Sequence, residues 1–523
     1  MLLLHRSLLA GLAALVLLLA AASLSWPFSW DHGIFAWIGD TIVRGGMPYR
    51  DAWDVKGPLT FYAFAAVEWL GGAGMRGIRI LDLLMLGLGA GAAARMARLL
   101  GGPGAGAYTF LVLAIQYIGT GYFETAQPDG WAGFLLLLGL VPLVRREDRT
   151  ALGPAIGSAI ALGTCLLLKP PYGIFALAPA AYLLLAPDLV TAAKLRALVV
   201  TGAAFLLPAL VCAAWFAWRG ALDELLETYV LFNLAQASVP LPGLDMSPGG
   251  ALLRFGRRLV LDPVLPASAL AAAVAVAATW RERPRAVKIL LLTTVAAFFT
   301  VFVQQRYWNR YHWHGAYLTL GLLAGIGLGR LWHRPGGGRI AGARLLAAGL
   351  GAAIVVSSLP QPLHHARRWL ELTAGRLTPA EYEAAFGHPT VSWTIATSRA
   401  LAGYLRSRTA PNEAVLVWSD PLVNYLSERP SVGRLGFHVP FSAPVLTPLH
   451  HRYRDELLQE LDRRPPRYIA VGRRHLEEAD SLNEANIAHA FPALRDRLLE
   501  RYAPVARFGE MELFERQPAA ESR

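Results

Sequence analysis

Charged residues are scarce in this chain of 523 residues, since only 16% are Asp, Glu, Lys or Arg. Hydrophobic residues make up 54%, and the mean hydropathy is +0.39. A soluble globular protein carries about 25% charged residues. The shortage of charge therefore excludes an ordinary soluble protein and predicts an integral membrane protein.

Cysteine is almost absent, and the two that occur, Cys165 and Cys212, both fall inside apolar runs. Two such residues form neither a disulfide framework nor a metal-ligand spacing. The chain also has no glycine-rich loop with the Lys-Ser/Thr ending that cradles a phosphate. No Asp-x-Asp pair of the kind that holds a nucleotide sugar through a metal is found in a soluble region.

Acidic residues are fewer than basic ones, and the formal net charge is +12. The basic residues gather in short clusters between apolar runs, such as RREDR (145–149), RERPRAVK (281–288) and HRPGGGR (333–339). Clusters of this kind mark the cytoplasmic loops of membrane proteins. The positive charge therefore predicts a membrane orientation and no nucleic-acid partner.

Long apolar runs are abundant, and a membrane span needs about 20 mostly apolar residues. About eleven spans are predicted, at 7–26, 77–99, 104–119, 129–144, 151–168, 172–187, 197–218, 263–280, 287–303, 313–331 and 341–358. The first is interpreted as an uncleaved helix with a cytoplasmic N-terminus. Alternation then places four loops that carry Lys or Arg on the inside, at 145–149, 188–196, 281–286 and 332–340. We expect a multi-pass protein of the inner (plasma) membrane.

The composition changes after residue 358, which divides the chain into a membrane domain (1–358) and a soluble domain (359–523). EAVLVWSD (413–420) and PRYIAVGRR (466–474) are typical of buried strands, and 502–516 of a strand pair. Segments 395–408 and 451–463 have the pattern of amphipathic helices. A periplasmic or extracellular α/β domain is predicted, and WSDPLVNYL (418–426) places polar residues at a strand end, where α/β domains bind ligands.

The first outer loop (27–76) is unusually long and charged. Its stretch WDHGIFAWIGDTIVRGGMPYRDAWDVKGP (30–58) predicts one helix before GG at 45–46 and a second after GP at 57–58. Both are expected to lie in the membrane interface with their aromatic faces toward lipid. Anchoring accounts for the aromatic residues, but it gives no reason for the carboxylates of Asp31, Asp51 and Asp54. Lys56 is a further charge of the same stretch.

Further ionisable residues fall in other loops predicted to face the same compartment. They are Glu124 and Asp129, Lys169 at the end of a span, and Arg306, Arg310 and His312 in VQQRYWNRYHWHG (303–315). An ionisable side chain at the centre of a span costs roughly 2.5–3.5 kcal/mol, and less near the interface. Acids and bases from four loops on one side therefore predict a substrate-binding cleft.

The pattern D…GG.PYRDAWDVKGPL resembles the first outer loop of the GT-C glycosyltransferases, specifically the bacterial relatives of protein O-mannosyltransferases and aminoarabinose transferases. The resemblance covers the membrane domain, and a C-terminal soluble domain recurs in many members. It implies a GT-C type polytopic α-helical fold and transfer of a sugar from a polyprenyl phosphate on the periplasmic face. Where the family often has two adjacent acids, this chain has Asp31 followed by His32.

The resemblance also implies roles for individual residues. Asp31 matches the family's general base, and Glu124 or Asp129 matches an acidic position of the second outer loop. Lys169 and the segment with Arg306 and Arg310 match basic positions near the lipid phosphate. No cofactor is predicted, although a divalent cation stays open because some enzymes of this architecture use one.

The predicted function is therefore inverting transfer of a sugar from a polyprenyl-phosphate donor, within the lipid bilayer, to a glycan, lipid or protein acceptor. A carboxylate would accept the proton of the acceptor hydroxyl. Arg or Lys would stabilise the phosphate leaving group. The alternatives are a transporter or flippase, which would have ionisable residues at mid-membrane and two related halves with broken helices, and a polyprenyl-lipid ligase or polymerase.

Overall fold

The computed structural model describes residues 2–71, 74–145, 150–237, 239, 247–304, 309–333, 340–388, 393–443, 445–476 and 486–518. The chain forms two compact units, each assembled from three segments. Unit 1 comprises Met1–Trp26, Arg76–Trp215 and Met246–Glu371. Unit 2 comprises Pro27–Met75, Phe216–Asp245 and Leu372–Arg523. The predicted first outer loop thus belongs to the same compact unit as most of the predicted soluble domain.

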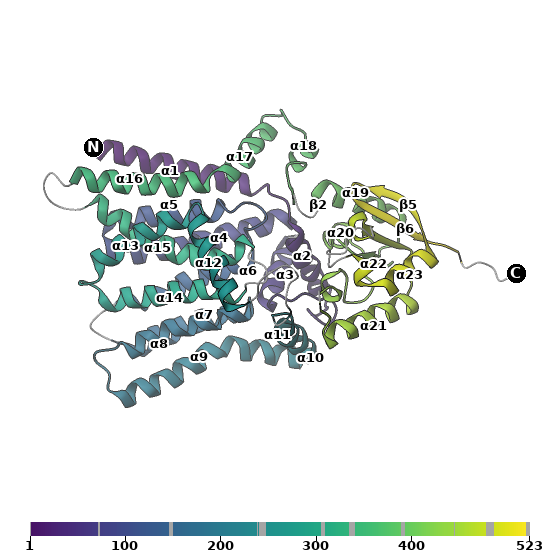
Figure 1. Cartoon of the computed structure of the whole chain (residues 1–523), viewed down its shortest axis with the longest axis horizontal. Helices are drawn as coiled ribbons and strands as arrows, with labels where there is room; N and C mark the ends of the chain where they lie inside the picture. The colour runs from purple at the N-terminus through teal and green to yellow at the C-terminus, as the bar shows by residue number, and fades with distance from the viewer. Residues whose placement is uncertain are drawn as a thin grey trace. The chain divides into compact units, whose positions relative to one another are not determined.

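Unit 1 is built from helices that run side by side (Figure 1). Its elements are α1 (Leu2–Ser23), α4 (Gly74–Gly101), α5 (Pro103–Ile118), α6 (Pro128–Leu140), α7 (Leu152–Thr164), η1 (Cys165–Leu167), η2 (Pro170–Ala176), α8 (Leu177–Leu184), α9 (Thr191–Trp218), α12 (Pro248–Leu261), α13 (Leu265–Thr279), α14 (Pro284–Val303), η4 (Arg310–Trp313), α15 (His314–Trp332), α16 (Ile340–Ser358) and α17 (Pro360–Thr373).

Each of the eleven apolar segments predicted from the sequence overlaps one of these helices. Among the described residues, four helices are long and apolar enough to cross a membrane, or up to six if two bent helix pairs each count as one span. Four further apolar helices, at Gly104–Ile118, Pro128–Leu140, Leu152–Leu167 and Pro170–Leu184, are shorter than the roughly 20 residues of a typical span. The helices are therefore confirmed, whereas the number of eleven spans stays a prediction.

The centre of unit 1 is α15, which is buried along almost its whole length. Small residues let neighbouring helices approach it closely: a Cβ on Gly327 would lie 1.9 Å from the carbonyl oxygen of Ala271 in α13. By contrast, α9 exposes a row of large apolar side chains, including Leu195, Val199 and Leu210. A buried central helix and an apolar outer helix are what a bundle surrounded by lipid requires.

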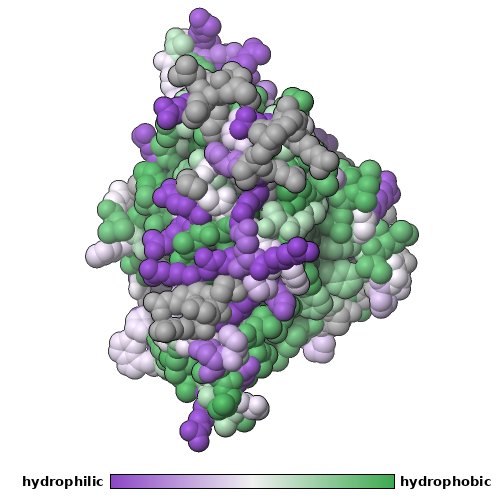
Figure 2. Space-filling view, turned by 90° about the vertical axis from the view of Figure 1, so that its left-hand side faces the viewer, coloured by the Kyte–Doolittle hydropathy of each residue, from purple (hydrophilic) through white to green (hydrophobic). Residues whose placement is uncertain are grey.

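The end of the bundle that carries the N-terminus and the connection between α8 and α9 displays hydrophilic side chains in a band between apolar ones (Figure 2). Residues 188–196 and 281–286, two of the loops predicted to be cytoplasmic, carry Lys194, Arg196, Arg281, Arg283 and Arg285. The hydrophilic band agrees with a polar membrane boundary at this end of unit 1.

Unit 2 combines helices with a small sheet. Its elements are α2 (Trp30–Val43), α3 (Pro58–Gly71), α10 (Leu222–Leu225), the π-helical η3 (Leu226–Phe232), α11 (Asn233–Ala237), α18 (Pro379–Glu383), β1 (Gly387–His388), β2 (Trp393–Thr394), α19 (Ile395–Arg408), β3 (Leu416–Val417), α20 (Leu422–Ser427), η5 (Val439–Phe441), α21 (Pro448–Arg463), β4 (Tyr468–Gly472), η6 (Arg473–His475), α22 (Ile487–Ala490), α23 (Pro492–Arg501), β5 (Tyr502–Phe508) and β6 (Met511–Arg516).

The sheet has the strand order β3-β4-β6-β5. Strands β3 and β4 are parallel, with Leu416 opposite Ile469, while β4, β6 and β5 pair antiparallel. The core beneath it gathers apolar residues of α19, α20, β3, β4 and β6, among them Leu401, Val417 and Leu513. The predicted strands, the terminal strand pair and the two amphipathic helices are confirmed.

Helices α2 and α3 pack on each other and on α20 through aromatic side chains. Phe35 is fully buried against Phe61 and Phe64, with ring centroids 6.2 Å and 5.5 Å away. Trp37 meets Phe437 of the C-terminal segment edge to face at 6.5 Å. The two helices were predicted correctly, but the prediction that their aromatic faces meet lipid is wrong for these side chains, because other aromatic residues of unit 2 cover them.

Candidate functional site

Asp31 lies in the first turn of α2 and is largely buried, with 8% of its surface exposed. The start of the helix is fixed by the neighbouring His32, whose Nδ1 accepts a hydrogen bond from the backbone N–H of Ser29 at 3.0 Å. The His32 ring itself is buried among Phe28, Phe35 and Phe64. His32 therefore caps and anchors the helix, which explains how the chain dispenses with a second acid there.

Asp54 and Lys56 follow in the loop before α3. Asp54 is almost fully buried, and its Oδ2 accepts a hydrogen bond from the backbone N–H of Lys56 at 3.4 Å. Burial raises the pKa of the Asp54 carboxyl, the positive charge of Lys56 lowers it, and the negative charge of nearby Asp31 raises it again. Asp31, Asp54 and Lys56 thus form one electrostatically coupled group.

The same loop is held in place by Arg434, which reaches it from the C-terminal segment. Arg434 donates to the carbonyl oxygen of Tyr49 at 3.1 Å, and its own carbonyl oxygen accepts from the Trp53 N–H at 3.0 Å. Its guanidinium pairs with Glu456 at 2.8 Å and with Glu227 at 3.3 Å. One side chain therefore joins all three segments of unit 2 around the acidic loop.

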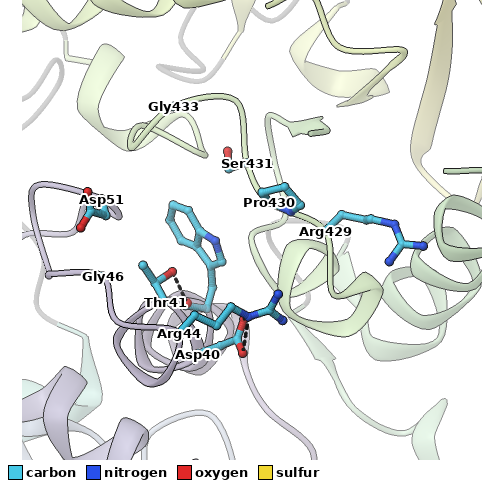
Figure 3. Close-up of a pocket in the computed structure, with 10 residues that line it drawn as sticks. Asp40, Thr41, Arg44, Gly46, Asp51, Arg429, Pro430, Ser431 and Gly433 are labelled. Carbon is cyan, nitrogen blue, oxygen red and sulfur yellow. Dashed lines mark hydrogen bonds and ion pairs between the residues drawn. The ribbon is translucent and has the colours of Figure 1, made fainter. Parts of the chain in front are cut away.

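A cavity of about 280 Å³ opens at the other end of α2 (Figure 3). It is lined by Trp37, Asp40, Thr41, Arg44, Gly46, Asp51, Arg429, Pro430, Ser431 and Gly433. Asp40 pairs with Arg44 at 2.9 Å, and Asp51 pairs with Arg50 at 2.8 Å. The guanidinium of Arg429 points away from these side chains and hydrogen-bonds to backbone carbonyls. The carboxylates of the cavity wall are thus already neutralised by cations of the protein.

Unit 1 brings Asp129 and Lys169 together in a buried ion pair. Lys169 Nζ lies 2.6 Å from Asp129 Oδ2, and the Tyr172 hydroxyl donates to Asp129 Oδ1 at 2.5 Å. Lys169 also donates to Gln304 Oε1 at 3.1 Å and lies 5.1 Å from the centre of the Tyr311 ring. The second outer loop, the Lys169 turn and the segment before α15 therefore converge, as the sequence predicted.

Glu124 joins this group, because its Oε2 accepts a hydrogen bond from the backbone N–H of Tyr311 at 2.7 Å. Arg310 and His312 flank Tyr311, and the His312 ring contacts the Tyr311 ring edge to face at 4.5 Å. Arg306, the remaining predicted residue, lies outside the described residues. Tyr172, Gln304 and Tyr311 were not predicted; the position of Tyr172 three residues after Lys169 was the only signal for it.

The second outer loop is positioned by buried polar contacts from α4. Arg79 donates to the carbonyl oxygen of Tyr122 at 3.0 Å and to Thr125 Oγ1 at 2.9 Å. Asp82 accepts from the Tyr117 hydroxyl at 2.6 Å, and that hydroxyl also accepts from the Ala126 N–H at 3.0 Å. These bonds fix the backbone on both sides of Glu124, so that Glu124 and Asp129 are held at defined positions.

The group of ionisable residues around Asp31 in unit 2 and the group around Asp129 in unit 1 differ in the chemistry that they can perform. Among the described residues, no group of three or more His, Cys, Asp or Glu side chains could hold a metal ion. In unit 2, Asp31 offers a carboxylate at the start of a helix, and Lys56 offers a cation in the same loop. In unit 1, Asp129 and Lys169 neutralise each other, which favours binding and positioning over proton transfer.

Comparison with known proteins finds solved structures of similar fold. Superposition on ArnT from Cupriavidus metallidurans bound to undecaprenyl phosphate gives a TM-score of 0.60 at 15% identity, covering 98% of this chain and 98% of that chain. The archaeal oligosaccharyltransferase AglB from Archaeoglobus fulgidus, in complex with an inhibitory peptide and a dolichol-phosphate, gives a TM-score of 0.52 at 11% identity. This match covers 97% of this chain and 74% of that chain. The Archaeoglobus fulgidus oligosaccharyltransferase complex with Zn and sulfate gives a TM-score of 0.51 at 13% identity, and the match covers 96% of this chain and 73% of that chain.

At these identities the likeness shows the fold alone, which this chain shares with both proteins over almost its whole length. No family model matches the sequence. No curated protein matches it either.

Proposed function

We propose that this chain is a membrane glycosyltransferase, which moves a sugar from a polyprenyl-phosphate carrier to a hydroxyl of a glycan, lipid or protein acceptor. The observation that carries the proposal is the fold, shared over 98% of both chains with a protein solved with undecaprenyl phosphate. The fold shared with an oligosaccharyltransferase solved with dolichol-phosphate adds support. The grouping of Asp31, Asp54 and Lys56 supplies the residues that such a reaction needs.

Asp31 is proposed as the general base. The acceptor oxygen forms a bond to the anomeric carbon while the bond from that carbon to the phosphate oxygen breaks. The hydroxyl proton passes to the Asp31 carboxylate, and the polyprenyl phosphate leaves with the electron pair. A single displacement of this kind inverts the anomeric carbon.

Lys56 is proposed to donate hydrogen bonds to the phosphate, because an ammonium group stabilises the charge that collects on the leaving group. Asp54 is proposed to hold Lys56, since its carboxylate accepts from the Lys56 backbone. A buried carboxyl group with a raised pKa, such as that of Asp54, is typical of functional sites.

In unit 1, Lys169 and Arg310, with Arg306, are proposed to bind the anionic carrier. Glu124 or Asp129 is proposed to position sugar or acceptor. The buried pairing of Asp129 with Lys169 supports this division, because it fixes the lysine beside the aromatic ring of Tyr311. His312 is proposed to contribute to the same binding group.

The chain is proposed to lie in the inner membrane, with a cytoplasmic N-terminus and the C-terminal domain outside. The Lys and Arg residues of 188–196 and 281–286 support this orientation, because cytoplasmic loops carry an excess of them. The end of unit 1 that carries the N-terminus is hydrophilic, in keeping with a membrane boundary there (Figure 2).

The proposal is tested by offering a panel of polyprenyl-phosphate sugars to the purified protein in detergent. Release of polyprenyl phosphate is measured for the wild type, for Asp31→Asn and for Asp223→Asn, an exposed carboxylate of α10. We expect turnover by the wild type and the Asp223 variant, and a loss of about 100-fold to 10,000-fold in the Asp31 variant. Full activity of an Asp31→Asn protein that inserts normally would refute its role, and binding without turnover of any donor would favour a transporter.

A further inference from the structure

A cluster of aromatic and hydroxyl groups lies where the parallel strands of unit 2 end. Ser419 follows β3, and His475 lies in the short helix that follows β4. Ser419 Oγ and His475 Nδ1 are 2.7 Å apart, and Ser419 Oγ accepts a hydrogen bond from the Gly472 N–H at 2.9 Å. The ring of His438 lies 5.7 Å from that of His475. Carboxyl ends of parallel strands are where α/β domains bind ligands.

The cluster also touches the residue that precedes Asp31. The indole N–H of Trp30 donates to the carbonyl oxygen of Ser419 at 2.8 Å, and its ring lies 5.5 Å from the ring of His438. Trp30, Ser419, His438 and His475 are all only partly buried. The strand ends are thus joined directly to the first turn of α2, where Asp31 lies.

A hydrogen bond to a backbone carbonyl defines which ring nitrogen of His438 carries a proton. His438 Nδ1 faces the carbonyl oxygen of Trp418 at 3.2 Å, so this nitrogen is the donor and Nε2 is an acceptor. Ser419 Oγ accepts from the Gly472 N–H and keeps a second acceptor lone pair, so it can donate to His475 Nδ1 or accept from Nδ1–H. Nε2 of His475 is therefore a donor in one tautomer and an acceptor in the other.

Burial lowers the pKa of His438 to about 4 and of His475 to about 3. Both rings are therefore neutral at pH 7. Neither Nε2 makes a hydrogen bond to any other part of the chain that the structure describes. The acceptor Nε2 of His438 thus stands on a neutral ring next to the neutral ring of His475 and the indole ring of Trp30.

We propose that Trp30, His438 and His475 form a subsite for a sugar ring, which holds it beside Asp31. A sugar hydroxyl both donates and accepts, so one hydroxyl matches the acceptor Nε2 of His438 and a neighbouring hydroxyl matches Nε2 of His475 in either tautomer. The apolar face of the ring packs on Trp30, as sugars pack on aromatic side chains that offer an apolar body and a polar tip. An anion fits less well, because the His438 Nε2 lone pair would face it.

The subsite rests on the proposed glycosyl transfer for its purpose, but its binding can be measured without any turnover. Saturation-transfer NMR with the methyl glycosides of mannose, glucose and galactose is recorded on the purified full-length protein. Removing two hydrogen-bonding rings weakens binding by roughly tenfold or more. We expect saturation transfer to at least one glycoside in the wild type, and its loss in the His438→Ala/His475→Ala variant.

The matched control is His451→Ala, an exposed histidine of α21 in the same unit, which we expect to behave as the wild type. The conservative variant Trp30→Phe, which keeps an aromatic ring, is expected to retain part of the signal. If the wild type gives no signal with any glycoside, or if the double variant keeps its signal, the subsite is refuted. Either result stands whether or not the protein turns over a polyprenyl-phosphate sugar, so the two proposals fail separately.

The same double variant tells which sugar is bound once turnover is established. Slower hydrolysis of the donor in water alone identifies the sugar of the donor. Unchanged hydrolysis with a raised KM for an added acceptor identifies the sugar of the acceptor. An unchanged rate in both reactions refutes a role of the subsite in the transfer.

Discussion

Gly33, two residues after Asp31 on α2, offers a test of how Asp31 is positioned. A Cβ at this residue would lie 2.6 Å from the Cβ of Leu422 in α20, 2.8 Å from its Cα and 2.9 Å from its N. Two of these atoms belong to the backbone, so a change of rotamer cannot relieve the contact. Carbon atoms prefer separations of about 3.5–4.0 Å, so Gly33→Ala has to displace the start of α2 by roughly 1 Å.

The effects on stability and on activity should differ in size. Alanine is preferred to glycine in a helix by about 1 kcal/mol, whereas overpacking costs about 1–3 kcal/mol. The net destabilisation should therefore not exceed about 2 kcal/mol, and the protein should fold. A displacement of about 1 Å at a reacting group can lower the rate about 100-fold.

The assay compares turnover of the donor and thermal unfolding in detergent for Gly33→Ala and Gly87→Ala. Gly87 lies inside α4 with no atom within 4 Å of its added Cβ, so this control should keep full activity. We expect a large loss of turnover in the Gly33 variant with a modest change in its unfolding temperature. Turnover within about threefold of the wild type, below the roughly 100-fold loss a 1 Å shift produces, would show that the contact with α20 does not position Asp31.

Three further predictions concern buried charges. Burial and the neighbouring Asp31 raise the folded pKa of Asp54 above its unfolded value, so ionisation of Asp54 destabilises the fold as the pH rises. The unfolding temperature of Asp54→Asn should therefore exceed that of the wild type at pH 8, and this difference should vanish toward pH 4. A difference that stays constant with pH would contradict this. Arg434→Met leaves the partly buried Glu456 without its ion pair, while Glu227 keeps its pair with Arg452. It should therefore destabilise the protein by about 2–3 kcal/mol in denaturant titrations, with Arg434→Lys in between. An unchanged midpoint would show that the contacts of Arg434 are dispensable. In unit 1, Asp129→Asn and Lys169→Met should each lower the free energy of unfolding by about 3–5 kcal/mol in denaturant titrations. The double variant should lower it by less than the sum of the two single changes. Strict additivity would argue against a coupled pair.

Much of the fold could be predicted because it depends on local patterns. Long apolar runs predicted the helices of unit 1, and β-branched residues between turn residues predicted strands β3 and β4. The helix α12 was not predicted, because its three arginines interrupt the apolar run. The aromatic residues of α2 were placed against lipid because sequence spacing shows which face is apolar, but not whether lipid or protein covers it.

The candidate site was partly predictable for a similar reason. Loop alternation predicted that Asp129 and Lys169 face the same side of the membrane, but it did not predict their ion pair. The contact between Ser419 and His475 could not, since 56 residues separate them and only the strand pairing brings them together. The polar residues after the predicted strand at 413–420 were the only signal of this cluster.

The assembly of unit 2 from three distant segments has a consequence for the time course of synthesis. Residues 27–75 leave the ribosome almost 300 residues before the segment that begins at Leu372. Because synthesis adds about 5–20 residues per second, α2 and α3 are made roughly 15–60 s before most of the residues that bury their aromatic side chains. Until then the start of α2 lacks Ser419, Leu422 and Arg434, the contacts that fix it and its loop. A nascent or prematurely terminated chain should therefore be inactive, which would confine sugar transfer to chains that have been completed.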